Sequence, residues 1–304
     1  MCKETTIAVG TTSGLRLFGP QETVEQEQRK VRGLHPEGRE LLAVFDDHTV
    51  ARRDSSGGWN TVAEVTDLRL NCVLSYEGTV LAGTSRAHLL NLGDNETQRV
   101  IAFEGAPGRD DWFTPWDGPP DVRSLDADGE HFYVNVHVGG ILRSDPRLES
   151  WEPTLDINSD VHEVHVVEGT RGLLLAACTW GLAVSRDGGD SWAFYTEGMH
   201  AHYCRAVVDC GDSILVTASL GPRGGRGAVY RCPLDKPEAL EKCEAGLPTW
   251  FADNIDTGCL TARDGTVVFG SGGEVFISRD AGATWATFAS GLPEVLGVTI
   301  FDEN

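Results

Sequence analysis

Lysine and long apolar runs are both scarce in this 304-residue sequence. Its lysines are Lys3, Lys30, Lys236 and Lys242. No stretch approaches the roughly 20 consecutive apolar residues that a membrane-spanning helix needs. The first residues contain no basic segment followed by an apolar one, which is the pattern of a secretion signal. We therefore expect a cytoplasmic protein.

Positive charge is also scarce, because 25 Lys and Arg residues stand against 46 Asp and Glu residues and give a formal net charge of −21. Nucleic acids and anionic lipids attract basic surfaces. We therefore expect neither a nucleic-acid partner nor a membrane, and a protein partner and the oligomeric state stay open. None of the eight cysteines belongs to a Cys-X-X-Cys pair, so we expect reduced thiols that lie mostly in the core.

One eight-residue pattern occurs twice, as SRDGGDSW at 185–192 and SRDAGATW at 278–285. The residues before each copy read as three short strands separated by turns, and a fourth strand starts at the closing tryptophan. The same layout of four strands in about 40 residues recurs where the pattern is degraded or missing. These further copies are 31–59, 70–94, 122–151 and 204–232.

The two ends of the chain complement one another, since 5–21 reads as a unit without its first strand and 294–301 as a first strand without its unit. The sequence therefore predicts an all-β fold, a seven-bladed β-propeller in one domain, 1–304. The terminal strand at 295–301 closes the ring and removes an open sheet edge. The expected blades are 295–304 with 1–30, 31–66, 67–103, 121–157, 160–198, 202–247 and 255–292, with an insertion loop at 104–120.

The repeated pattern resembles the Asp-box (BNR) repeat of sialidase-like propellers in the WD40/YVTN/BNR-like superfamily. The matching residues are Ser185, Asp187, Gly189 and Trp192, and again Ser278, Asp280, Gly282 and Trp285. The aspartate can accept hydrogen bonds from backbone N–H groups of its own turn, and the tryptophan can pack between sheets. This role is structural, so the catalytic or binding residues are expected elsewhere.

The first strand of a blade is the innermost one, and aligned strand starts place one residue of each blade at the channel mouth. These residues are Arg32, Asn71, Arg123, His162, Arg205, Gly258 and Leu296. Three arginines that converge in a chain of charge −21 predict an anionic ligand held by bidentate hydrogen bonds. Alternatively, each arginine forms an ion pair on the same rim, with Asp121, Asp160, Asp256 or Glu294.

Loops on the same face add further candidates. The turns between second and third strands bring Asp46, Asp47, His48, His137 and Trp180. The long loops 104–121 and 246–258 carry Trp112, Phe113, Trp116, Trp250 and Phe251, which either wall the site or pack onto the propeller. Histidines are dense between 131 and 202, and His137, His162 and His202 are candidate ligands of a divalent transition metal. Otherwise these imidazoles are neutral donors or ligand contacts.

True sialidases use an arginine triad, a tyrosine–glutamate nucleophile and an aspartate acid. The resemblance therefore implies that Arg32, Arg123 and Arg205 form the triad, with Tyr203 as nucleophile and Asp256, Asp47 or Asp121 as acid. The Arg-Ile-Pro motif of that family is missing, and alternation along the strand points Glu163 away from Tyr203. We expect an Asp-box propeller that binds a small anionic ligand at the channel mouth, whether or not it processes it. The alternatives are a sialidase-like glycoside hydrolase, a metal-dependent lyase or hydrolase, and a protein-binding scaffold.

Overall fold

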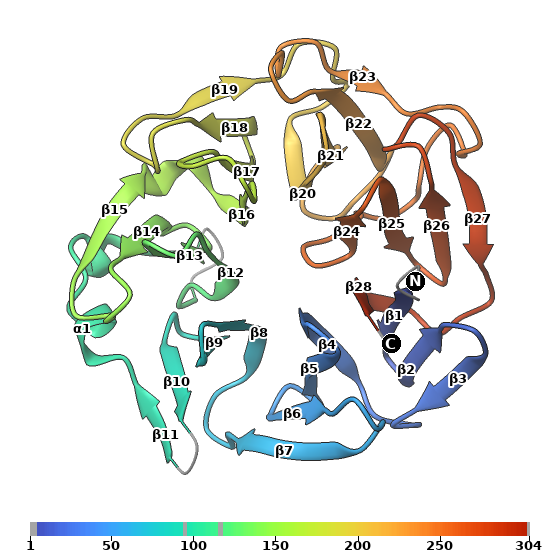
Figure 1. The fold of residues 1–304 in the computed structure, drawn as a ribbon. Coiled ribbons are helices and arrows are strands. Elements are labelled where there is room, and N and C mark those ends of the chain that lie inside the picture. Colours follow the sequence, from blue (N-terminus) through green and yellow to red (C-terminus); the bar gives the residue numbers. More distant parts are fainter. Residues whose placement is uncertain (1–4, 94–95, 115–117, 303–304) are drawn as a thin grey trace.

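The computed structural model describes residues 5–93, 96–114 and 118–302. Seven four-stranded antiparallel sheets stand around a central axis, each with its first strand innermost (Figure 1). The predicted seven-bladed propeller is confirmed. No helix in these ranges has the length and apolar character needed to cross a membrane.

The strands follow the repeat closely. The first blade combines β28 (Val295–Asp302), β1 (Thr5–Thr11), β2 (Gly14–Phe18) and β3 (Glu22–Glu25). The second contains β4 (Val31–Glu37), β5 (Glu40–Phe45), β6 (Thr49–Arg53) and β7 (Trp59–Glu64). The third contains β8 (Leu70–Tyr76), β9 (Thr79–Thr84), β10 (Leu89–Gly93) and β11 (Glu96–Arg99). The fourth contains β12 (Val122–Ala127), β13 (Phe132–Val136), β14 (Gly140–Ser144) and β15 (Trp151–Leu155).

The last three blades have the same order. The fifth contains β16 (Val161–Val166), β17 (Leu174–Cys178), β18 (Gly181–Ser185) and β19 (Ala193–Tyr195). The sixth contains β20 (Tyr203–Cys210), β21 (Ser213–Ser219), β22 (Ala228–Pro233) and β23 (Glu241–Lys242). The seventh contains β24 (Leu260–Arg263), β25 (Thr266–Ser271), β26 (Glu274–Ser278) and β27 (Ala286–Ala289). The short helix α1 (Ile101–Glu104) ends where the expected insertion loop begins, η1 (Arg109–Asp111) lies within that loop, and η2 (Ile157–Ser159) precedes β16.

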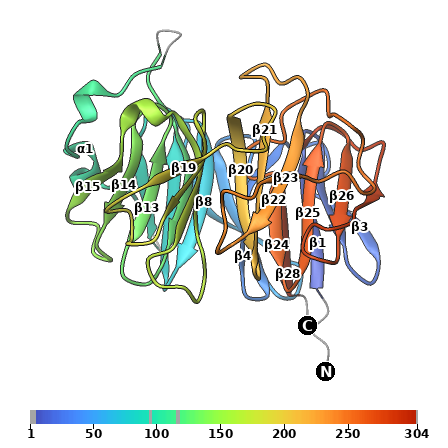
Figure 2. The same ribbon diagram turned by 90° about the horizontal axis from the view of Figure 1, so that it is seen from above.

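The ring closes as the ends of the sequence predict. β28 pairs antiparallel with β1, and Thr5 stands opposite Asp302 at one end of the register. Both chain ends therefore lie on one face of the disk, which we call the terminal face (Figure 2). The innermost strands begin at the opposite face, which we call the mouth face.

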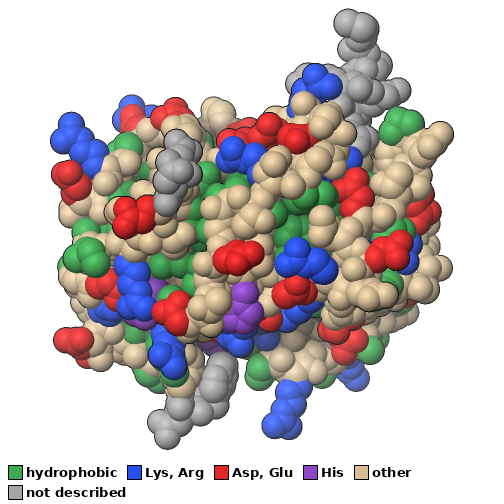
Figure 3. All heavy atoms as spheres, turned by 90° about the horizontal axis from the view of Figure 1, so that it is seen from below, with side chains coloured by type: hydrophobic (Ala, Val, Ile, Leu, Met, Phe, Trp, Pro, Cys, Tyr) green, Lys and Arg blue, Asp and Glu red, His purple; other side chains and the backbone are tan. Residues whose placement is uncertain are grey.

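The core lies between neighbouring sheets. Every residue of β17 and of β21 is buried, because a second strand is covered by the blades on both sides. The rings of Tyr133, Tyr230 and Phe269 are fully buried there, and burying an apolar side chain of such size contributes about 1.5–3 kcal/mol. On the flank of the disk shown in Figure 3, acidic and basic side chains are interspersed.

The two repeated turns have the same hydrogen bonds. Asp187 accepts from the backbone N–H of Ser191 at 2.9 Å and from its hydroxyl at 2.6 Å, and Ser185 donates to Asp187 at 2.8 Å. Asp280 accepts from Thr284 in the same way. Trp285 is buried, and Trp192 is partly buried against the core. These contacts agree with the structural role inferred from the pattern.

Candidate functional site

A cavity of about 710 Å³ occupies the channel below the mouth face. Its volume falls in the range of small-molecule sites, about 300–1,000 Å³. Among the predicted residues, Arg32, Asn71, Arg123, Arg205, Gly258, Leu296 and Asp256 line it. The cavity wall carries basic and acidic groups together: Lys30, Arg32, Arg69, Arg123, Arg205 and Arg223, with Asp47, Asp121, Glu163, Asp253, Asp256 and Glu294.

β-Bulges in the innermost strands set the direction of several of these side chains. The pairing between the first and second strands skips a residue near the start of most innermost strands, as between Val122 and Ser124 on β12. The skipped residues include Asn71, Arg123, His162, Arg205 and Leu296. A bulged residue has no partner on the next strand, so its side chain leaves the regular alternation. Most of the sites predicted from strand starts are therefore also bulged positions, whereas Arg32 is paired with Val44 and Gly258 precedes β24.

Ion pairs occupy part of the cavity wall. Asp47 Oδ2 lies 2.7 Å from Lys30 Nζ, and Asp47 Oδ1 lies 3.3 Å from Arg32 Nε. Arg69 lies 2.9 Å from Asp121. The alternative of internal ion pairs therefore describes Arg32, although its partner is Asp47 rather than one of the expected rim residues.

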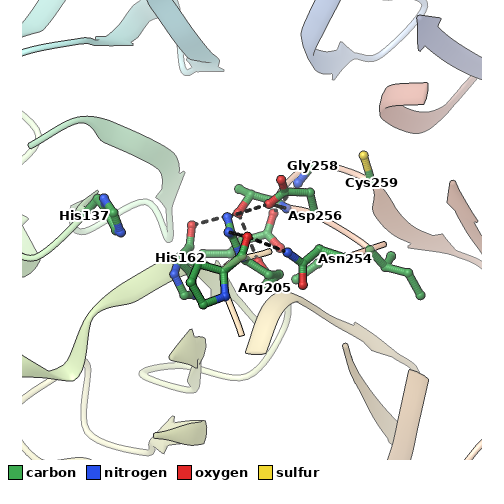
Figure 4. A network of polar contacts seen from close by, with 12 residues as sticks. His137, His162, Arg205, Asn254, Asp256, Gly258 and Cys259 are labelled. Atoms are coloured by element: carbon green, nitrogen blue, oxygen red, sulfur yellow. Dashed lines mark hydrogen bonds and ion pairs between the residues drawn. The ribbon is translucent and has the colours of Figure 1, made fainter. Parts of the chain in front are cut away.

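Arg205 is held from several sides. Its Nη1 lies 3.0 Å from Asp256 Oδ1, and its guanidinium lies over the Tyr203 ring, 5.1 Å from the centroid. Its Nη2 donates to the carbonyl of Pro222 at 3.5 Å, and Asn254 donates to the same carbonyl. Figure 4 shows Arg205 gathered with Asp256 and Asn254 on one side of the channel. The expected pairing of an arginine with Asp256 is thus present.

Arg123 is the exception among the three arginines predicted from the strand starts. This half-buried guanidinium lines the cavity, and within the described residues no hydrogen bond or ion pair to it is found. Burial lowers the pKa of Arg123, and the neighbouring charge of Arg205 lowers it further. Two guanidinium groups that share one cavity, one of them without a carboxylate, favour an anionic third group.

Glu163 was not among the residues predicted at the channel mouth. It lines the cavity, since the bulge between Val161 and Glu163 breaks the alternation of β16. Its carboxylate accepts from the backbone N–H groups of Val207 at 3.0 Å and Gly258 at 3.1 Å. Burial outweighs these donors and raises the pKa of Glu163 to about 8. A strict two-residue alternation along β16 does not predict that Glu163 faces the cavity.

His162 points away from the cavity, into the boundary between blades. It is fully buried there, with its ring 5.6 Å from that of His137 and 4.8 Å from that of Tyr203. Asp160 completes this group: its Oδ1 lies 2.9 Å from His137 Nε2 and 3.8 Å from His162 Nε2. The backbone of Asp160 is left-handed, with φ of 46°. We call these three residues the histidine cluster: His137, Asp160 and His162.

Burial and neighbouring charges shift the pKa values of the histidine cluster. It lowers the pKa of His137 and that of His162, and the arginines of the cavity lower them further. Burial alone would raise the pKa of Asp160, but hydrogen bonding and the two imidazoles outweigh it and hold that pKa below its usual range. Arg123 and Arg205 act on both histidines, so the cluster and the cavity are electrostatic neighbours.

Three other predicted site residues lie outside both the cavity and the histidine cluster. His202 is exposed and does not join the histidine cluster. Trp180 is 50% exposed and contacts Phe194 on the outermost strand. Tyr203 is half-buried between His162 and Arg205 and does not line the cavity.

Most of the predicted loop residues also contact the propeller and do not line the cavity. His48 bonds the backbone carbonyls of Val65 and Leu68, and Asp46 pairs with Arg29. Most loop aromatics pack onto the propeller, as the alternative reading expected: Trp112 on Phe103, Trp250 on His200, and Phe251 on Phe269 and Phe276. Phe113 is exposed, and Trp116 lies outside the described residues.

Part of the cavity wall comes from a pair of loops, of which only the 246–258 loop was predicted. The turn after β21 runs against the segment before β24, with Gly225 N–H donating to Ala252 O and Gly227 bridging Phe251. Pro222, Arg223 and Gly224 thereby reach the cavity wall. The glycines of this turn were the available signal, because Gly224 and Gly225 have positive φ and Gly227 has no room for a side chain.

No protein-family model matches the chain, and no curated protein matches it. Membership of the Asp-box family therefore stays a prediction. Solved propellers share the fold. The GH74 xyloglucanase of Xanthomonas campestris aligns with a TM-score of 0.62 at 14% identity, over 93% of this chain and 46% of that one. YCF48 bound to a D1 peptide aligns with a TM-score of 0.58 at 15% identity, over 93% and 83%. The WD40 repeats of RRP9 give 0.62 at 15%, over 89% and 83%.

Proposed function

We propose that this propeller binds a small molecule with an anionic group in the central cavity. Arg123 is the main contact, and Arg205 is the second. The observation that carries this proposal is the Arg123 guanidinium, which lines the cavity beside a like charge and has no carboxylate partner in the described residues. A carboxylate or phosphate oxygen pair fits the planar fork of an arginine.

The cavity residues that already have a partner have other roles in the proposed site. Arg69 pairs with Asp121, and Asp47 is shared by Arg32 and Lys30, so these residues orient the cavity wall and most of their positive charge is offset. Asn71 donates to the carbonyl of Val122 and fixes the bulge beside Arg123. The acidic groups of the wall reject a ligand of high negative charge. A single carboxylate, or a singly charged phosphate ester with hydroxyl groups, therefore fits best.

The test is a binding screen of small carboxylates, phosphate esters and sialic acid, first by thermal shift and then by calorimetry. Changing Arg123 to alanine is expected to weaken binding of any hit by at least about tenfold, since a charge-assisted hydrogen bond contributes roughly 1.5–3 kcal/mol. Arg123→Lys is expected to recover only part of the affinity.

Arg171→Ala is the matched control. Arg171 is 85% exposed and pairs with Glu130 away from the cavity, so the variant should bind like the wild type. Equal affinity in the wild type and Arg123→Ala would refute the assignment. A wild-type protein that binds none of these anions, but captures peptides, would favour a protein-binding scaffold of the kind suggested by the YCF48 neighbour.

Hydrolysis of a glycosidic bond is the second candidate, and Glu163 is the observation that favours it. A carboxyl with a pKa of about 8 keeps its proton at neutral pH and can protonate a leaving oxygen, while a second carboxylate such as Asp256 assists. Umbelliferyl glycosides, sialosides included, test this candidate. Activity that falls above about pH 8 and disappears in Glu163→Gln would support it, and activity unchanged in that variant would exclude Glu163 as the acid.

A further inference from the structure

A site distinct from the cavity is formed by the histidine cluster. Its three side chains come from different segments: His137 from the turn between β13 and β14, Asp160 from the residue before β16, and His162 from the bulge in β16. Their potential ligand atoms all lie within 4.8 Å of one another. Of the described residues, these are the group of histidine, cysteine and acidic side chains with such spacing.

The hydrogen bonding of His162 is the main evidence for this site. Its Nδ1 lies 2.5 Å from the backbone carbonyl of Cys204. A carbonyl oxygen only accepts, so Nδ1 holds the proton and the Nε2 of the neutral ring presents a lone pair. That Nε2 is fully buried and has no hydrogen-bond partner. It faces Asp160 Oδ1 at 3.8 Å. That oxygen lies 2.9 Å from His137 Nε2, so the lone pair of His162 is the one left without a donor.

The surroundings of the cluster orient its ligand atoms. Thr179 Oγ1 donates to Asp160 Oδ2 at 2.7 Å, which leaves Oδ1 turned to the imidazoles. The Cys204 carbonyl fixes the tautomer and the ring plane of His162. The backbone N–H of His137 donates to the carbonyl of Asp121. Metal-binding histidines and carboxylates are commonly held by such outer partners.

We propose that His137, Asp160 and His162 bind a divalent first-row transition metal, with Zn²⁺ or Co²⁺ as the fitting ions. Two imidazole nitrogens and one carboxylate oxygen are the donors that these ions prefer. In a tetrahedral site with bonds of about 2.1 Å, ligand atoms are about 3.4 Å apart. The distances of 2.9 and 3.8 Å to Asp160 Oδ1 bracket this value. The fourth position is left for water or a ligand atom.

The test is titration of the purified, metal-stripped protein with Co²⁺, followed by visible absorption. We expect one Co²⁺ per chain with the intense bands of a tetrahedral site, and displacement by Zn²⁺. In Asp160→Asn, which keeps size and the acceptor for Thr179, affinity for Co²⁺ should fall at least tenfold. A melting curve close to that of the wild type shows that this variant is folded.

His202→Ala is the matched control, because His202 is exposed and lies just before β20. It should bind Co²⁺ like the wild type. The proposal is overturned if the wild type binds no stoichiometric Co²⁺ at about 100 µM, if Asp160→Asn binds it equally, or if His202→Ala loses it. His137→Ala gives a second ligand variant in which binding must also weaken.

Arg123→Ala separates this proposal from the anion-binding one. Arg123 places a positive charge near both histidines, and like charges repel a metal ion. The variant should therefore bind Co²⁺ severalfold more tightly, although it loses the anionic ligand. Equal or weaker Co²⁺ binding in this variant would contradict a metal ion placed near Arg123, and it would overturn the assignment to the histidine cluster.

Discussion

At the scale of single residues, the surroundings of a side chain decide its charge. His165 on β16 lies between two carboxylates of the neighbouring blades, with its Nε2 2.7 Å from Asp209 and its Nδ1 3.5 Å from Asp126. Burial opposes the charged imidazole, but the two carboxylates outweigh it and raise the pKa of His165 to about 10. Three residues away, His162 is held neutral by burial and by arginines.

The pH dependence of stability follows from His165. Its folded pKa lies above its ordinary value of 6.5, so the protonated form stabilises the fold fully below about pH 6.5. This stabilisation is lost as the pH rises towards 10. Between these limits the free energy of unfolding should fall by on the order of 2 kcal/mol more in the wild type than in His165→Gln. Urea unfolding at several pH values measures this difference, and parallel curves for the two proteins would contradict it.

At the scale of elements, turns and bulges have separate tasks. The repeated turns bind their own backbone through Asp187 and Asp280, and they lie between third and fourth strands, on the terminal face. The bulges of the innermost strands lie at the mouth and carry the cavity residues. The stabilising turns and the proposed ligand-binding residues therefore lie at different ends of the same blades.

Asp280→Ala should consequently lower the melting temperature and leave anion affinity unchanged. The variant removes the acceptor for the backbone N–H and hydroxyl of Thr284, a loss like that of a capping residue, so we expect a decrease of about 2–4 °C. Asp67→Ala is the control, since Asp67 is largely exposed and lies 3.6 Å from Arg99. Differential scanning calorimetry with a ligand titration tests both parts, and a large change in affinity would show that the two ends are coupled.

At the scale of the whole molecule, β28 holds the ring shut. It supplies the innermost strand of the first blade and packs Val298 and Ile300 against the seventh. Removing residues 295–304 would expose the edge of β1 and a core face together. Exposed strand edges pair with other chains.

The truncated chain is therefore expected to aggregate or stay unfolded, as seen by size-exclusion chromatography and circular dichroism. The control is a circular permutant that joins the chain ends by a short linker and opens between β7 and β8. Thr5 and Asp302 are register partners, so the linker is short and every blade keeps its four strands. A monomeric, folded truncation would show that closure is dispensable.

The blade repeat, the closure of the ring and the face on which a cavity lies can all be predicted from the amino-acid sequence. Local turn chemistry and strand spacing carry this information within about 40 residues, and the two complementary chain ends carry it at the termini. The sequence also placed Arg32, Asn71, Arg123 and Arg205 in one ring, because position along an innermost strand fixes height in the channel.

Tertiary packing determines which arginine has a carboxylate partner, which side chain of the bulge faces the cavity and which residues contact His137. The Glu163 side chain lines the cavity and that of His162 does not, because one bulged residue breaks the two-residue alternation of β16. Asp160, rather than His202, meets the two histidines. Such contacts depend on the distance between blades, and a single sequence does not encode that distance in any local pattern.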